Sequence, residues 1–163
     1  MKSVVENYLQ ENYKLITRED YRNCDLSDNT KKILCDVGLP YEPFCFVKFN
    51  IEEIENIKLD EEHIIIGNDF DINICINKRN EVVVIDTKNE YPIRFINKNL
   101  ESFLHFIIIF LSYKDKINEA DDDEINQIVQ EIRTEFDIID IQALSNEENW
   151  WSTILEEIEF GVM

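Results

Sequence analysis

Residues 70–86, FDINICINKRNEVVVID, decide the fold of this chain, because two apolar segments there flank a short polar turn. The first segment alternates between apolar and mostly polar side chains, and its apolar set is Phe70, Ile72, Ile74 and Ile76. A period of two is typical of a strand with one buried face. The second segment, residues 82–86, is apolar on both faces, which predicts a central strand covered on both sides.

Three further segments have the composition of strands: residues 44–49, 63–67 and 92–96. The turns GND, NKRN and TKNE are so short that the last four strands should form an antiparallel meander. Pro92 lacks an amide hydrogen, so we expect its position to need no donor in the ladder. The sequence therefore predicts a central sheet of about five strands, mainly antiparallel, with a mixed sheet as the alternative.

Helical periodicity appears on both sides of the strands. Residues 4–16 place apolar side chains on one stripe and predict a first helix. Residues 27–40 predict a second, with Asp28 or Thr30 as its N-cap. Gly38 suits the left-handed position after that helix, and the proline two residues later forbids its continuation. These segments form an N-terminal helical region.

The stretch NLESFLHFIIIFLSYKD, residues 99–115, is the most apolar in the chain. A membrane-spanning helix needs about 20 apolar residues, and this run is shorter. It predicts a helix capped by Asn97 or Asn99 that is covered on more than one side, with a residual surface patch as the alternative.

Two more helices are expected, over residues 121–136 and 145–161, the last opened by a Ser145–Glu148 capping box. We predict one α+β domain over residues 1–163, in which three C-terminal helices pack on the sheet.

The net charge of the chain indicates which classes of partner it can attract. Among 163 residues, Asp and Glu number 35 and Lys and Arg 16, for a formal net charge of −19. That field disfavours nucleic acids and anionic membranes, and it attracts basic proteins. The alternative is that the acidity serves only solubility. The first residues show no signal peptide, so we expect a cytoplasmic protein.

Metal sites are not indicated. The cysteines, at positions 24, 35, 45 and 75, fit no zinc spacing and are expected to be reduced and structural. Residues 69–73, DFDIN, resemble the start of a calcium loop, but Ile74 stands where the loop needs glycine and Asn80 where it needs glutamate. The acidic run at residues 121–124 is explained by a helix cap and dipole. We expect no metal and no cofactor.

Catalytic motifs are also missing from the sequence. His63 and His105 stand in no recognisable Ser/His/Asp or Cys/His pattern, and no phosphate-binding loop or nucleophile elbow occurs. A surface is therefore the expected functional feature, and the chain is expected not to be an enzyme. We predict an acidic platform on the sheet, with the aromatic Tyr41 as an anchor; its alternative is a face that is solvated or covered by helices. On the face opposite the isoleucine stripe, we expect Asp69, Asp71 and Asn73 to form a row, with Glu81, Asp86 and Glu90 at neighbouring strand ends. The predicted carboxylate contacts are Asp69, Asp71, Glu81, Asp86 and Glu90.

An ordered set of motifs resembles the SUKH superfamily, particularly its bacterial immunity proteins. The motifs are VGLP at 37–40, IIIG at 64–67, INICINKRNEVVVID at 72–86, RFINKNLESFLHFI at 94–107 and the tail IDIQALSNEENWWSTILEEIEFG at 139–161. The resemblance implies a mixed sheet-and-helix fold and a non-enzymatic role. It implies that the chain protects a bacterium by binding a cognate polymorphic toxin, often a nuclease.

Three functions follow from these observations. The first is an immunity protein that occludes a basic toxin domain. The second is a non-enzymatic adaptor or regulatory scaffold of the same superfamily, and the third is a hydrolase or metal enzyme with dispersed ligands. The sequence indicates neither the toxin's activity nor an oligomeric state.

Overall fold

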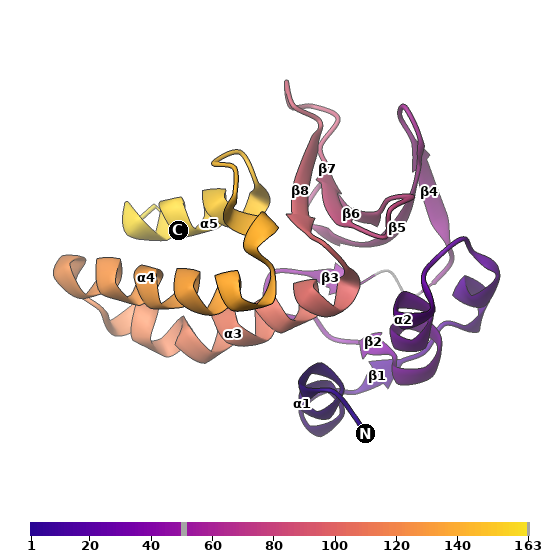
Figure 1. Ribbon diagram of the computed structural model, residues 1–163, viewed down its shortest axis with the longest axis horizontal. Coiled ribbons are helices and arrows are strands. Elements are labelled where there is room, and N and C mark those ends of the chain that lie inside the picture. Colours follow the sequence, from indigo (N-terminus) through magenta and orange to yellow (C-terminus); the bar gives the residue numbers. More distant parts are fainter. Residues whose placement is uncertain (50–51, 163) are drawn as a thin grey trace.

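A computed structural model describes residues 1–49 and 52–162. Figure 1 shows a strongly curved sheet with α1 and α2 beneath it, and three helices that extend to one side. The elements follow in the order α1 (Val4–Asn12), β1 (Leu15–Ile16), η1 (Glu19–Asn23), α2 (Asp28–Lys31), η2 (Lys32–Val37), β2 (Leu39–Pro40), β3 (Lys48–Phe49), β4 (Glu55–Lys58), β5 (Glu62–Asp69), β6 (Ile72–Ile76), β7 (Val82–Ile85), β8 (Ile93–Asn97), α3 (Leu100–Glu119), α4 (Asp122–Ile139), η3 (Ile141–Leu144) and α5 (Trp150–Glu159).

The larger sheet has the order β3-β5-β6-β7-β8, and β4 also pairs with β5. Each of these pairings is antiparallel, which confirms the predicted meander. The register shifts between Ile65 and Gly67 and again between Val82 and Val83. Such irregularities increase the local twist of a sheet, and the sheet in Figure 1 is correspondingly bent. The fold is α+β, as predicted.

Strand β7 is buried on both faces, as its composition predicted. Val82 and Val84 belong to the main core, which the helices complete, whereas Val83 and Ile85 belong to a second apolar cluster with Ile65 and Cys75. Alternate side chains of a strand point to opposite faces, so the sheet separates these two clusters. Strand β7 lies between β6 and β8, where its apolar side chains contribute to the cluster on each face.

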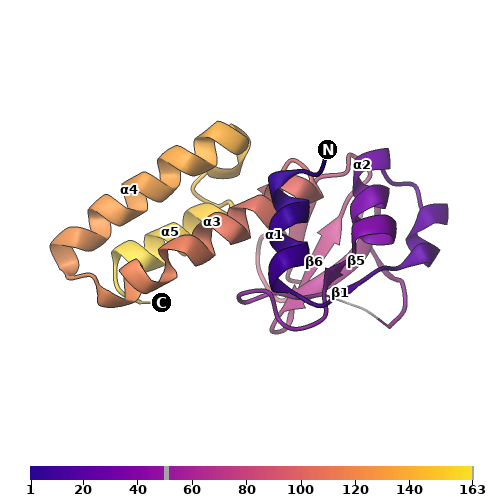
Figure 2. The same cartoon turned by 90° about the horizontal axis from the view of Figure 1, so that it is seen from below.

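The apolar stretch at residues 99–115 lies within α3, whose N-cap is Asn99. Its side chains pack against α4 and α5, where Trp151 lies 5.6 Å from Phe106 and 5.1 Å from Phe136 between ring centroids. Figure 2 shows α3, α4 and α5 side by side beyond the edge of the sheet. The helix is therefore a core element, as predicted. Throughout the described residues, every helix is too short or too polar to cross a bilayer.

Several predicted boundaries were wrong. Helix α1 ends at Asn12, and the residues that should have continued it form β1, which pairs with β2. The predicted strand at residues 44–49 is a strand only in β3. The second helix is capped by Ser27 and continues as a π-helix until Gly38, which has φ +96° as its predicted role requires. Longer-range pairing outweighed local periodicity at these places.

The predicted Ser145–Glu148 capping box does not open α5, because Ser145 lies after η3 and its hydroxyl donates to Gln142 O. Asn149 precedes the first residue of α5, and its amide donates to Gln142 O and Ala143 O. A capping box is instead present at α4, where the Asp121 side chain accepts from Glu124 N at 2.8 Å. The acidic run at residues 121–124 is thus a helix start, as predicted.

A buried polar chain ties α5 and η3 to the edge of the sheet. Trp151 Nε1 donates to Asn97 Oδ1 at 2.9 Å, and Asn97 Nδ2 donates to Asp140 Oδ2 at 3.1 Å. Asp140 also accepts from the backbone of Lys98 and Gln142. Buried polar groups are tolerated when they are satisfied in this way. We call the three side chains Asn97, Asp140 and Trp151 the polar latch.

Candidate functional site

The β5–β6 and β7–β8 turns leave the sheet at the same end, because the meander reverses direction at each turn. Asn73, near the start of β6, pairs with Ile85, the last residue of β7, and Ile85 pairs with Ile93 at the start of β8. Neighbouring strands lie about 4.8 Å apart, so the two turns are adjacent. We call the side chains that they present the turn-end patch: Asp69, Phe70, Asp71, Asp86, Glu90, Tyr91 and Ile93.

Exposed apolar side chains occupy this end of the sheet. Phe70 is 92% exposed, Tyr91 60% and Ile93 38%. Phe70 also has φ +53°, a left-handed conformation that is uncommon for a bulky residue. Strained residues of this kind cluster at binding and switch sites. Aromatic side chains that project into solvent among carboxylates have the chemistry of interface anchors.

The second turn is built by its own polar groups. Asp86 Oδ1 accepts from Lys88 N at 3.1 Å, and Asp86 N donates to Pro92 O at 2.8 Å. Asn89 Oδ1 accepts from Tyr91 N at 3.1 Å. These bonds hold the turn that carries Glu90 and Tyr91, so part of the hydrogen-bonding capacity of Asp86 serves structure.

Asp69 has the most unusual electrostatic surroundings in the patch. It is half-buried, and burial raises the pKa of its carboxyl, with a further increase from Glu157 of α5. Both effects disfavour the carboxylate in the free protein. A positive charge beside Asp69 would offset both effects by stabilising its carboxylate.

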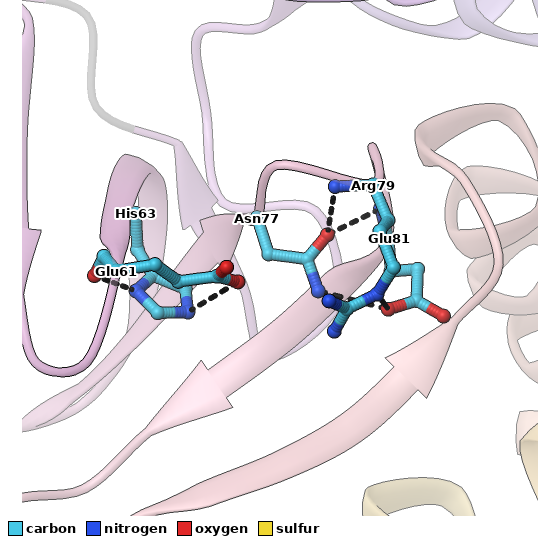
Figure 3. A network of polar contacts seen from close by, with 5 residues as sticks. All are labelled: Glu61, His63, Asn77, Arg79 and Glu81. Carbon is cyan, nitrogen blue, oxygen red and sulfur yellow. Dashed lines mark hydrogen bonds and ion pairs between the residues drawn. The ribbon is translucent and has the colours of Figure 1, made fainter.

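Glu81, one of the predicted contacts, lies at the opposite end of the sheet. It follows the β6–β7 turn, where its Oε1 accepts from Asn77 Nδ2 at 2.9 Å and pairs with Arg79 Nε at 3.0 Å (Figure 3). The Asn77 side chain in turn accepts from the backbone of Arg79 and Glu81. The turn-end patch therefore excludes Glu81, whose contacts stabilise a hairpin.

Near this second group lies His63, which the same view shows beside Glu61. Its Nδ1 is 3.0 Å from Glu61 O, and the ring is buried in β5. His105 is on α3, where burial lowers the pKa of its imidazole. The two histidines occupy different elements, and each is accounted for by packing.

Tyr41 lies apart from both ends of the larger sheet. It follows β2 in the small β1–β2 sheet, beside α1 (Figure 1). Its ring is 45% exposed, and Lys14 Nζ lies 5.0 Å from the ring centroid. Lys14 of the same chain lies over the ring face, and Tyr41 follows a strand of the small sheet, whereas the turn-end patch belongs to the larger one.

The predicted row of Asp69, Asp71 and Asn73 on one strand face was wrong. Asp69 ends β5 opposite Ile72 and therefore shares the face of the main core, whereas Asn73 pairs with Asn68 on the other face. Asp71 lies in the turn between them. Phe70 is also excluded from the predicted apolar stripe, because the turn reverses the chain there. The remaining apolar residues, Ile72, Ile74 and Ile76, do contact the core.

Comparison with known families decides the class of this protein. The SUKH-4 immunity protein family matches residues 14–157, which is most of the chain. The chain belongs to the SUKH-4 immunity protein family. Searches of curated proteins and of solved structures found no match. The resemblance that the ordered motifs indicated is confirmed.

In this SUKH-4 chain, sequence reasoning missed the exposed Phe70 and Tyr91. The available signals were their positions, one between two aspartates and the other directly before Pro92, both typical of turns. Within the described residues, no group of three or more His, Cys, Asp and Glu side chains is placed to hold a metal ion. The four thiols are free, and two of them, Cys35 and Cys75, are buried.

Proposed function

We propose that this SUKH-4 immunity protein neutralises a cognate toxin by binding a basic surface of the toxin domain through the turn-end patch. The observation that carries the proposal is the junction of exposed Phe70 and Tyr91 with four carboxylates at one end of a rigid sheet. Aromatic anchors supply the affinity of such an interface, and complementary charge supplies its encounter rate.

The partner's chemistry follows from charge. A protein with a formal net charge of −19 attracts cationic surfaces over a Debye length of about 8 Å at physiological ionic strength. Toxins that cleave nucleic acids need basic surfaces to hold phosphates. We infer that the patch covers such a surface in the cytoplasm and prevents substrate access, and that the chain performs no chemistry itself.

Four of the six predicted contacts belong to this interface: Asp69, Asp71, Asp86 and Glu90. Glu81 and Tyr41 face other directions, so they would contact a toxin only if it reached around the molecule. The adaptor hypothesis would use the same patch for another basic protein. The reading frame beside the gene distinguishes the two, because a toxin gene there supports immunity.

The test uses the toxin domain encoded beside the gene and measures its association rate by surface plasmon resonance at low and high salt. Asp69→Lys with Asp71→Lys should reduce the rate at low salt by about tenfold, because steering depends on local charge. Glu11→Lys with Asp25→Lys is the matched control, since both residues are exposed in the N-terminal region, Glu11 on α1 and Asp25 in the loop between η1 and α2. Equal rates for the two double variants would refute the assignment of the patch.

The anchors are tested separately. Phe70→Ala and Tyr91→Ala should each accelerate dissociation, with a loss of at least 1 kcal/mol of binding free energy as a rough threshold for a hot spot. Both side chains are exposed in the free protein, so the fold should tolerate their removal. Unchanged dissociation rates in both variants would contradict the anchoring role.

A further inference from the structure

A second concave surface lies where the far ends of the helices meet. It is formed by the C-terminal half of α3, the first turns of α4, the end of α5 and the segment before β3. Its volume is about 810 Å³, within the range of about 300–1,000 Å³ found for ligand pockets. We call it the helix-end groove.

Apolar side chains line part of the groove. Phe46 and Phe110 contribute aromatic rings that pack 5.8 Å apart, and Ile117, Ile125 and Ile158 add aliphatic surface. Phe160, directly after α5, is 72% exposed at the rim. A large aromatic side chain in this position is stabilised when a partner buries it.

The rim of the groove is acidic. Asp121, Asp122 and Glu159 line it, with Lys114 as a base on α3. Asp121 caps α4, and Glu159 Oε1 lies 3.7 Å from Arg133 Nη2, whereas Asp122 is exposed. Helices α3 and α5 end at the groove with partial negative charge, whereas α4 begins there with partial positive charge that its Asp121 cap offsets. The groove therefore favours an apolar ligand that carries a positive charge.

One residue of the turn-end patch, Asp69, lies near the groove. Cys45 lines the groove, and burial raises the pKa of its thiol; Lys114 and Asp69 lie near enough to add smaller effects of opposite sign. The negative charge of Glu157 on α5 in turn contributes to the raised pKa of Asp69. A partner docked on the patch would thus have the groove beside it.

We propose that the helix-end groove binds a polypeptide segment of a partner protein in which apolar side chains flank a lysine or arginine. The groove is open and is bordered by three helices, which suits an extended polypeptide segment. A second copy of this chain would bring another 19 negative charges to an acidic rim. This inference goes beyond the proposed function, since it names a second site and its ligand chemistry.

The test titrates the isotopically labelled 19.5 kDa chain with the peptide acetyl-Leu-Leu-Lys-Leu-Leu-amide and follows amide chemical shifts. The peptide with glutamate in place of lysine is the ligand control. We expect shifts in the groove residues, including Ile125 and Phe160, and at least tenfold weaker binding of the acidic peptide. Equal binding of both peptides, or shifts confined to other surfaces, would overturn the proposal.

Two matched pairs of variants assign the effect to the groove. Phe160→Ala should weaken peptide binding by about tenfold, because the burial of its ring is lost. Phe70→Ala, which removes another exposed ring, in the turn-end patch, should leave peptide binding unchanged. Asp122→Asn should weaken binding by about threefold at low salt, whereas Asp71→Asn should not. Equal effects within either pair would refute the groove assignment.

Sedimentation velocity without peptide tests whether a second copy of this chain occupies the groove instead. A concentration-dependent dimer that Phe160→Ala abolishes would show that a second copy fills the groove, and the proposal would fail. The peptide titration contains no toxin, so its result does not depend on whether a toxin binds the turn-end patch. Peptide binding to the groove and toxin capture by the patch can therefore fail independently.

Discussion

Replacement of Asp140 by alanine should destabilise the protein strongly, because it removes the acceptor at the centre of the polar latch. Asp140 is 2% exposed and accepts hydrogen bonds from Asn97 Nδ2 at 3.1 Å, Lys98 N at 2.8 Å and Gln142 N at 3.2 Å. The variant leaves three donors without this partner. Two of them lie in part-buried positions where water can take its place.

The magnitude follows from the burial of each donor. A hydrogen bond to a charged group contributes roughly 1.5–3 kcal/mol net, and an orphaned buried donor costs a similar amount. Asn97 Nδ2 is fully buried and should bear the whole cost, whereas the two backbone amides bear less. We expect a loss of about 4 kcal/mol in the free energy of unfolding, a large share of the roughly 5–15 kcal/mol typical of a domain.

Asp140→Asn is the matched control. Its carbonyl oxygen can still accept from Asn97 and Lys98, and only the Gln142 N–H loses its acceptor, so we expect a loss of only about 1–2 kcal/mol. Equilibrium urea unfolding followed by circular dichroism measures both variants, with the slope m checked against the wild type. If alanine and asparagine destabilise the chain equally, or alanine costs under about 1 kcal/mol, the latch does not hold the helices to the sheet.

Three further predictions concern single sites. Gly67→Ala should cost about 2 kcal/mol in urea unfolding, because its Cβ would lie 2.7 Å from Lys48 O and push β3 away from β5. Burial raises the pKa of the Tyr21 phenol to about 12, so stability should fall as pH rises above 10, where the unfolded phenol ionises and the folded one does not. Absorbance at alkaline pH should show a late phenolate step that is smaller in Tyr21→Phe, and equal titrations would contradict the burial. Asp69→Asn should stabilise the chain at pH 7 by about 0.5 kcal/mol, because a carboxyl whose folded pKa is raised penalises the charged form. The gain should vanish at pH 3, below the ordinary pKa, and a gain that persists there would point to packing.

Local sequence patterns correctly predicted most of the secondary structure. The alternation at residues 72–76 and the apolar run at 82–85 correspond to β6 and β7, and Gly38 ends its helix where its conformational freedom predicted. These features depend on neighbours within a few residues, so the sequence records them directly. The same holds for the Asn99 cap of α3 and for the motif order that indicated the SUKH superfamily.

Features that depend on distant pairing were missed. The periodicity at residues 4–16 continues past Asn12, but β1 is drawn into pairing with β2, which lies more than 20 residues away. Ser145 has the sequence of a cap, yet η3 occupies that segment and α5 begins at Trp150. In both cases a tertiary contact outweighs a local preference of similar size.

The candidate site shows the same division. Composition alone determined that the chain is acidic and led to the prediction of basic partners, because charge is a sum over residues and needs no geometry. Only the tertiary structure decided that Asp69, Asp71, Asp86 and Glu90 share one end of the sheet with Phe70, while Glu81 lies at the other end. Which carboxylates act together depends on the direction in which each hairpin leaves the sheet, and the helix-end groove exists only where three helix ends converge. Distances between residues far apart in the chain are set by packing, and no local pattern encodes them.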